Sequence, residues 1–173
     1  MKIINCEFGA HGKDVLAIIN DTIATSTWVY DYEPRSIQFM ESYFADKAAN
    51  GLPIVGAIDD SGALMGYGSY GQFRNWPGYK YTVEHSVYVN REFRLRGIGT
   101  ALLKQLMQLA IQQDYHVMIG AIDSSNTPSI ALHEKLGFSL AGTMKEVGFK
   151  HGQWLDAIFY QAILHTPAHP VDG

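Results

Sequence analysis

The stretch from residue 81 to residue 113 limits the possible folds of this chain more than any other part of the sequence. Residues 81–89 (YTVEHSVYV) are rich in Thr, Val and Tyr and alternate in polarity, which predicts a β-strand. Residues 100–113 (TALLKQLMQLAIQQ) place apolar side chains every three or four positions, which predicts an amphipathic helix. Residues 90–98, between them, form a basic loop that carries Gly97. This order of strand, loop and helix favours an α/β or α+β protein whose helices pack on the faces of a sheet.

The loop before the predicted helix has the features of a phosphate-binding site. A helix N-terminus leaves backbone N–H groups unpaired and carries a partial positive charge. Gly97 and Gly99 let a phosphate approach that backbone with no Cβ in the way, Arg94 and Arg96 add positive charge, and Thr100 adds a hydroxyl. Taken in isolation, a tight turn that needs glycine for geometry alone explains the loop equally well, because a bare GxG is a weak signal.

Two common nucleotide motifs are absent. A Walker loop requires GxxxxGK[ST], which this sequence lacks. A Rossmann fingerprint requires a small residue where Leu102 stands, and Asp114 precedes the next predicted strand rather than following it. A nucleotide-binding oxidoreductase is therefore disfavoured.

The rest of the chain alternates between helix and strand signals. Apolar residues at helical spacing predict helices, β-branched runs predict strands, and Gly, Asp and His-Gly pairs mark the turns. Pro34 is expected to open the second helix and Gly137 to follow the last one. The expected helices are 14–23, 35–49 and 129–136, and the expected strands are 53–58, 63–71, 116–122, 138–149 and 154–163, with an aromatic loop at 72–79.

Composition narrows the classes of partner. The 173 residues are expected to form a single domain over 1–165 with a loosely ordered tail at 166–173. The net charge of −4 and the absence of a basic run argue against nucleic acid. No apolar stretch is long enough to span a membrane and the N-terminus does not resemble a signal peptide, while the single cysteine, Cys6, fits the cytoplasm. The histidine spacing predicts no metal site, because Pro167 separates His165 from His169.

Two motifs give the loop a more specific meaning. Arg94-x-x-Gly97-x-Gly99 resembles the acetyl-CoA signature of the GNAT acyltransferase superfamily. Beginning 27 residues after Gly99, a second segment resembles the other GNAT signature: Asn126-x-x-Ser129-x-x-Leu132-His133-Glu134-Lys135-x-Gly137-Phe138. Residues 82–89 and 148–156 are further similar to the phosphinothricin/methionine sulfoximine acetyltransferases. The resemblance implies a mixed, mostly antiparallel sheet, splayed open in the middle, with helices on both faces, acetyl-CoA in the opening, and a homodimer.

The resemblance also suggests two catalytic residues. Glu84 lies on the strand before the loop and is our candidate for the base that deprotonates the acceptor amine, directly or through a water. The alternative is a strand carboxylate that pairs with a nearby cation. His133 occupies the position of the tyrosine that most GNAT enzymes are proposed to use as general acid, and the subgroup itself has His there. An imidazole can donate a proton near neutral pH, but a histidine that only packs on the short helix remains an alternative. His85 points to the opposite strand face and is interpreted as a core residue.

The remaining site residues divide between acetyl-CoA and the acceptor. By resemblance, residues 87–89 pair with the pantetheine arm, and the Val87 N–H is the candidate oxyanion donor. The expected acetyl-CoA contacts are Val87, Tyr88, Val89, Arg94, Leu95, Arg96, Gly97, Ile98, Gly99, Thr100, Asn126 and Ser129. Asn126 alternatively serves as a helix cap. An amino-acid acceptor needs a cation for its carboxylate, and the candidates for its pocket are Arg74, Asn75, Tyr81, Thr82, Lys150 and Trp154, whose aromatics alternatively belong to a dimer interface.

The function predicted from these residues is transfer of acetyl from acetyl-CoA to the α-amino group of a small amino-acid analogue such as phosphinothricin, methionine sulfoximine or methionine sulfone. Two other classes stay open. The acceptor can be another amine, such as a polyamine or a protein N-terminus, or the domain can be an acyl-CoA sensor without catalysis. The presence of both Glu84 and His133 argues against the sensor.

Overall fold

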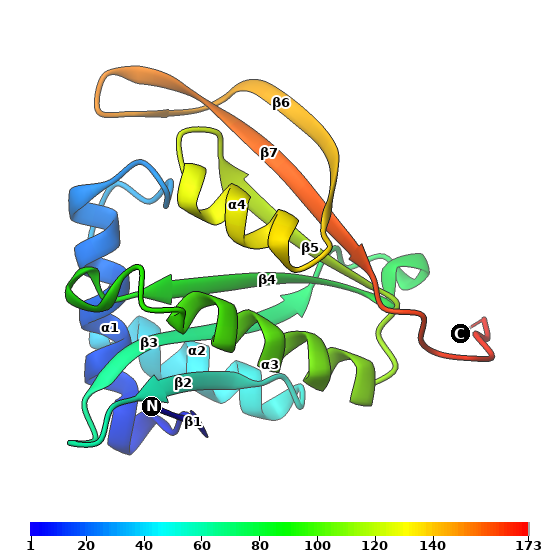
Figure 1. The fold of residues 1–173 in the computed structure, drawn as a ribbon, viewed down its shortest axis with the longest axis horizontal. Coiled ribbons are helices and arrows are strands. Elements are labelled where there is room, and N and C mark those ends of the chain that lie inside the picture. The colour runs from blue at the N-terminus through cyan, green and yellow to red at the C-terminus, as the bar shows by residue number, and fades with distance from the viewer. Residues whose placement is uncertain (173) are drawn as a thin grey trace.

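A computed structural model describes residues 1–172 and shows one seven-stranded sheet flanked by helices (Figure 1). The strands are β1 (Lys2–Asn5), β2 (Ile54–Ile58), β3 (Leu64–Gln72), β4 (Thr82–Val89), β5 (Val117–Asp123), β6 (Ser139–Lys150) and β7 (Gln153–Ile163). They lie in the order β1-β2-β3-β4-β5-β7-β6. Within the described residues every neighbouring pair is antiparallel except the central pair, β4 and β5. The mixed, mostly antiparallel sheet that the sequence predicts is thus confirmed.

Helices cover both faces of the sheet (Figure 1). They are α1 (Phe8–Thr25), α2 (Ile37–Ala49), α3 (Ile98–Gln112) and α4 (Thr127–Lys135), with short 3₁₀ turns at Pro77–Tyr79 and Arg91–Phe93. The leucines of α3 belong to one buried cluster, together with Val83 of β4 and Met118 of β5. The apolar residues of α1 and α2 belong to a second cluster, together with Tyr67 of β3. Because side chains alternate along a strand, the two clusters fill the two faces of one sheet.

The sheet opens at its centre. β4 and β5 are paired from Thr82↔Val117 to His85↔Gly120, but β4 continues to Val89 and β5 to Asp123 without further partners between them. In Figure 1 the ends of these two parallel strands diverge. The predicted splay is therefore present, and it begins immediately after His85.

The structure corrects several predicted boundaries. The strand β1 was not predicted, because four residues with a half-exposed pattern carry little periodic signal. The first helix begins at Phe8 rather than at residue 14. The second helix is not opened by Pro34: Ser36 is its N-cap, with a hydroxyl that accepts from the Phe39 N–H at 3.1 Å, and Ile37 is its first residue. Gly137 follows α4 with φ +84°, as its position predicts.

The predicted tail begins after the last strand. Residues 164–172 contain no helix or strand, and Gly173 lies outside the described residues. Among residues 1–172 no helix is long and apolar enough to cross a membrane.

Candidate active site

The opening between β4 and β5 is the centre of a cavity of about 400 Å³. Its lining comes from the diverging strand ends, the 94–100 loop, the start of α4 and two residues around the end of α1. On β4 the lining runs continuously from His85 to Val89, and on β5 from Gly120 to Asp123. Since neighbouring residues on a strand point to opposite faces, a continuous lining means that the cavity passes through the sheet from one face to the other.

The loop before α3 presents unpaired backbone donors to this cavity. Gly97 is the N-cap with φ +79°, a conformation that glycine adopts without strain. The helical bonds begin with the Ala101 N–H, which donates to the Gly97 carbonyl at 3.0 Å, so the N–H groups of residues 98–100 have no intrahelical acceptor. The Ile98 side chain is buried in the core, so this residue can offer a ligand only its backbone. The geometry fits the predicted phosphate cradle.

Arg94 stands at the mouth of the cavity. Its guanidinium lies 5.0 Å above the ring of Trp28, and its Nε donates to the Val89 carbonyl at 3.3 Å. Arg96 instead lies over Phe93 and does not line the cavity, whereas Leu95 lines it and is almost fully exposed. Of the two predicted arginines, Arg94 is therefore held over the opening, whereas Arg96 remains an exposed charge near it.

The start of α4 forms the opposite wall. The Asn126 side chain accepts from the Ser129 N–H at 3.2 Å, so Asn126 is the helix N-cap that the alternative interpretation expected. Both residues also line the cavity. A cap role and a contact with a ligand are compatible, because the Asn126 amide N–H₂ stays available as a donor.

His133 and His85 meet in the lining of the cavity. They are 3% and 6% exposed, and their Nε2 atoms lie 3.0 Å apart. His133 Nδ1 lies 2.7 Å from the Ser129 carbonyl oxygen. Burial lowers the pKa of both imidazoles, that of His85 to about 3. His85, interpreted from the sequence as a core histidine, is buried but also lines the cavity.

Glu84 lies on the face of β4 opposite to that of His85, and its side chain does not line the cavity. Its neighbour on the same strand face, Ser86, does, and residues two apart on a strand are separated by roughly 6–7 Å. Glu84 is half-buried, which raises its pKa above the usual range of a glutamate, while the charge of Arg74 opposes that shift. The carboxylate thus lies two positions from a residue of the opening, and its pKa responds to the charge of Arg74.

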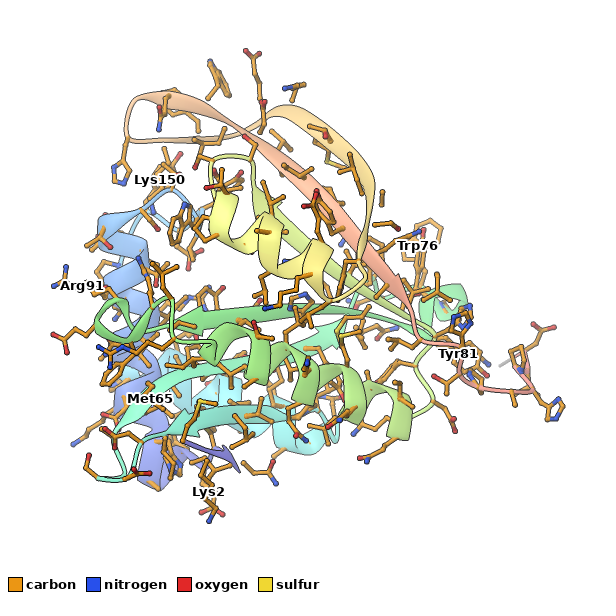
Figure 2. All side chains as sticks on the ribbon, viewed as in Figure 1. Lys2, Met65, Trp76, Tyr81, Arg91 and Lys150 are labelled. Atoms are coloured by element: carbon orange, nitrogen blue, oxygen red, sulfur yellow. The ribbon has the colours of Figure 1, made fainter. Side chains whose placement is uncertain are left out.

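None of the six predicted acceptor residues lines the cavity. Arg74 and Asn75 lie in the exposed loop after β3, where the Arg74 guanidinium stacks on Phe73 at 4.2 Å. Tyr81 and Lys150 lie at opposite ends of the molecule (Figure 2). The Tyr81 hydroxyl is bonded to the backbone of Val171. Thr82 begins β4 at its paired end, far from the splay.

Lys150 and Trp154 also differ from the sequence interpretation. Lys150 is 2% exposed, and its Nζ donates to the carbonyls of Ile23, Ser26 and Val29 at 2.7–2.9 Å, which uses all three of its N–H groups. Its place between the β6–β7 hairpin and the end of α1 is visible in Figure 2. Trp154 is 63% exposed on that hairpin and packs edge-on against Phe149. Neither side chain is directed at the cavity.

Several lining residues were missed by the sequence analysis. Thr22 and Trp28 come from the end of α1 and the loop after it, and Asp123 from the end of β5. For the β5 residues a signal existed: a strand parallel to β4 must present its carboxyl end at the same edge. Trp28 carried no such signal, because nothing local places that loop over the sheet. Among residues 1–172 no cluster of three His, Cys, Asp or Glu side chains could hold a metal ion.

Comparison with known proteins agrees with this geometry. Residues 20–138 match the family described as "Acetyltransferase (GNAT) family". The chain belongs to the GNAT acetyltransferase family. It is an acetyl-CoA-dependent N-acetyltransferase.

Individual relatives cover nearly the whole chain. The L-methionine sulfoximine/L-methionine sulfone acetyltransferase of Pseudomonas aeruginosa is 43% identical over 85% of this chain and 86% of its own length. An acetyltransferase structure from Acinetobacter baylyi ADP1 superposes with a TM-score of 0.97 at 47% identity, covering 99% of this chain and 96% of that one. A GNAT phosphinothricin acetyltransferase from Sinorhizobium meliloti, solved with AcCoA, gives 0.93 at 35% identity, with 98% and 91% covered.

Proposed function

We propose that this enzyme acetylates the α-amino group of a small amino-acid analogue, with methionine sulfoximine, methionine sulfone and phosphinothricin as acceptors. The observation that carries the proposal is Glu84, a half-buried carboxylate two residues before the cavity-lining Ser86 on the same strand face, whose pKa also responds to the charge of Arg74. A base for an ammonium and a cation for a carboxylate are the two groups that an amino-acid head requires. The relative from Pseudomonas aeruginosa is a methionine sulfoximine/methionine sulfone acetyltransferase and that from Sinorhizobium meliloti is a phosphinothricin acetyltransferase, which supports the same acceptors.

In the proposed reaction the amine attacks the thioester directly. Glu84 takes a proton from the acceptor ammonium through a water, because the cavity-lining residue on its own strand face, Ser86, lies two positions further along β4. The free amine adds to the carbonyl carbon, and the Val87 backbone N–H stabilises the resulting oxyanion. Arg74 holds the acceptor carboxylate. Collapse of the tetrahedral intermediate breaks the C–S bond and releases the thiol of CoA.

Roles at the cofactor end follow from the lining. Pyrophosphate oxygens bind the N–H groups at the start of α3 and Arg94, and the pantetheine arm lies between the diverging strands beside residues 87–89. Asn126 and Ser129 contact the arm from α4. The exposed Leu95 and Arg96, together with Thr100, flank the phosphates.

An acceptor panel tests this function. Release of free thiol from acetyl-CoA is followed with phosphinothricin, methionine sulfoximine, methionine sulfone, spermidine and a peptide with a free N-terminus. Saturable turnover with the first three, at kcat/KM values at least tenfold above the last two, is the expected result. Turnover only with spermidine or the peptide would refute the acceptor class while retaining the enzyme. Acetyl-CoA binding without turnover on any member would favour the sensor.

We propose further that the enzyme works as a cytoplasmic homodimer. β6 is one of the two edge strands of the sheet, and the β6–β7 hairpin exposes a group of large apolar side chains. They are Leu140, Met144, Val147, Phe149, Trp154 and Ile163. An exposed edge with apolar side chains is a surface that a second chain can cover. The cytoplasm supplies the acetyl-CoA that the reaction consumes.

The dimer has a direct test. Sedimentation equilibrium at micromolar concentration is expected to give twice the 19.2 kDa chain mass. The double variant Met144→Asp/Val147→Asp is expected to sediment as a monomer with an unchanged circular dichroism spectrum, because it places charges on the apolar surface. A wild-type monomer at that concentration would refute the proposal.

A further inference from the structure

His85 and His133 form a close pair whose hydrogen atoms can be assigned from their partners. A carbonyl oxygen only accepts, so His133 Nδ1, 2.7 Å from the Ser129 oxygen, carries a hydrogen. A neutral imidazole has one N–H, which leaves His133 Nε2 as an acceptor. His85 Nε2, 3.0 Å away, must then be the donor. This arrangement leaves His85 Nδ1 as a bare lone pair.

The surroundings reinforce this assignment. His85 Nδ1 is buried and has no hydrogen-bond partner among residues 1–172. If His133 also carried a hydrogen on Nε2, two N–H groups would face each other unless His85 moved its hydrogen to Nδ1, where no acceptor lies. Adding a proton to His133 therefore requires an unsatisfied N–H in a buried position, which is unfavourable because that donor loses its bonds to water without gaining an acceptor.

The His85 and His133 rings lie against the backbone of β5 at Gly120. The rings stack with centroids 5.0 Å apart, 22° from parallel, and Phe138 packs edge-on against both. A Cβ at Gly120 would lie 2.5 Å from His133 Nε2 and 3.0 Å from His85 Nε2. The absence of a side chain at position 120 is thus what admits the contact between the two nitrogens.

We propose that His85 is a positioning residue for acetyl transfer: its Nε2–H holds His133 as the neutral Nδ1–H tautomer and so keeps an imidazolium out of the cavity that both rings line. The burial that lowers both imidazole pKa values acts in the same direction. Other polar groups around the pair are the Ser129 hydroxyl, 3.5 Å from His133 Nδ1 and so much farther than the carbonyl, and the Tyr160 hydroxyl on β7, which donates to Glu134 of α4. Asp123 lines the same cavity further along β5.

This proposal rests on the proposed function and changes one step of it. The resemblance implies that His133 protonates the leaving thiolate, but a neutral His133 has its N–H committed to Ser129 and its lone pair committed to His85. The proton balance closes without it. The ammonium gives its first proton to Glu84, and the attacking nitrogen, positively charged in the tetrahedral intermediate, gives the second to the departing sulfur as the C–S bond breaks.

Nitrogen-15 NMR of the histidines tests the tautomer without any acceptor. In the wild-type enzyme at pH 7, His133 is expected to show a pyrrole-type Nδ1 and a pyridine-type Nε2, with the reverse for His85. In His85→Phe, His133 loses its partner and is expected to titrate closer to the ordinary histidine pKa of about 6.5. In His85→Gln, whose amide N–H can still donate, His133 is expected to stay neutral as in the wild type.

Kinetics provide the second measurement. As the pH is raised from 6 to 8.5, wild-type kcat is expected not to fall. If His133 were the general acid, kcat would instead fall as the pH rises through the His133 pKa. His85→Phe is expected to acquire a new ionisation in this range, and His85→Gln to restore the wild-type profile. His169→Phe, at an exposed histidine far from the pair, is the control and should change neither measurement.

Some outcomes would overturn the proposal. They are a wild-type His133 protonated on both nitrogens at pH 7, an unchanged His133 titration in His85→Phe, or a failure of His85→Gln to restore the tautomer. If the His85 variants do not fold, the wild-type spectrum alone decides. Because that spectrum needs no turnover, its result is independent of whether the proposed acceptors are correct.

Discussion

Replacing Glu84 with glutamine is expected to lower kcat for the acceptor reaction by roughly 10²–10⁴-fold, the usual contribution of a general base. Glutamine has nearly the shape of glutamate but cannot accept the proton of an ammonium. The KM for acetyl-CoA should change little, because Glu84 does not line the cavity in which we propose that acetyl-CoA binds. Initial rates of thiol release at saturating acceptor measure the effect.

The pH dependence gives the same residue a second test. Glu84 acts as a base only when ionised, and burial raises its pKa above the usual range, with Arg74 opposing the shift. Wild-type kcat should therefore fall as the pH is lowered through this raised pKa and stay constant above it. Arg74→Gln removes the opposing charge, so it should move this fall to higher pH.

A matched control separates catalysis from charge. Glu41 is an exposed glutamate on α2, far from the splay in the chain fold, and Glu41→Gln changes the net charge by the same amount. It should retain wild-type kcat and pH profile. If Glu84→Gln keeps more than half of the wild-type kcat, Glu84 is not the base. Its carboxylate then serves only to pair with a nearby cation.

The sequence predicts the part of this fold in which local periodicity and tertiary burial agree. β4 and α3 match their predicted ranges within two residues because alternation and helical spacing are both strong there. β1 has only four residues, and its pairing with β2 is what makes it a strand. The first turns of α1 contain Gly9 and Gly12, which weaken the helical signal in the sequence. These turns are helical in the structure, where Gly12 is buried.

The site divides in the same way. The phosphate loop is local in sequence, so its glycines and arginines were recognisable as a unit. The contact between His85 and His133 joins residues 48 positions apart. Alternation predicted the face of His85 but contains no information about what lies opposite. The hydrogen-bond partners of a lysine ammonium are equally non-local. The sequence therefore suggested Lys150 for the acceptor pocket, whereas its Nζ binds three backbone carbonyls more than 120 residues away in the chain.

Replacing Lys150 with methionine is expected to have the second largest effect, which is on the free energy of unfolding rather than on kcat. The Lys150 ammonium binds one carbonyl at the C-terminal end of α1 and two in the segment that follows, a favourable place for a cation. Lys150→Met keeps most of the apolar stem but leaves three carbonyls without this donor. Hydrogen bonds to charged groups contribute about 1.5–3 kcal/mol, so we expect a loss of roughly 3 kcal/mol of unfolding free energy.

For a chain of this length such a loss lowers the Tm by roughly 6–12 °C, measurable by calorimetry. Lys145→Met is the control on the same strand, because Lys145 is exposed and makes one surface ion pair with Asp156, so its loss should leave the Tm nearly unchanged. The segment that Lys150 holds also carries Trp28, which lines the cavity beneath Arg94. At a temperature where Lys150→Met is folded, its KM for acetyl-CoA should therefore rise while kcat is retained. Equal Tm values for the two variants would show that the buried ammonium is not what anchors this segment.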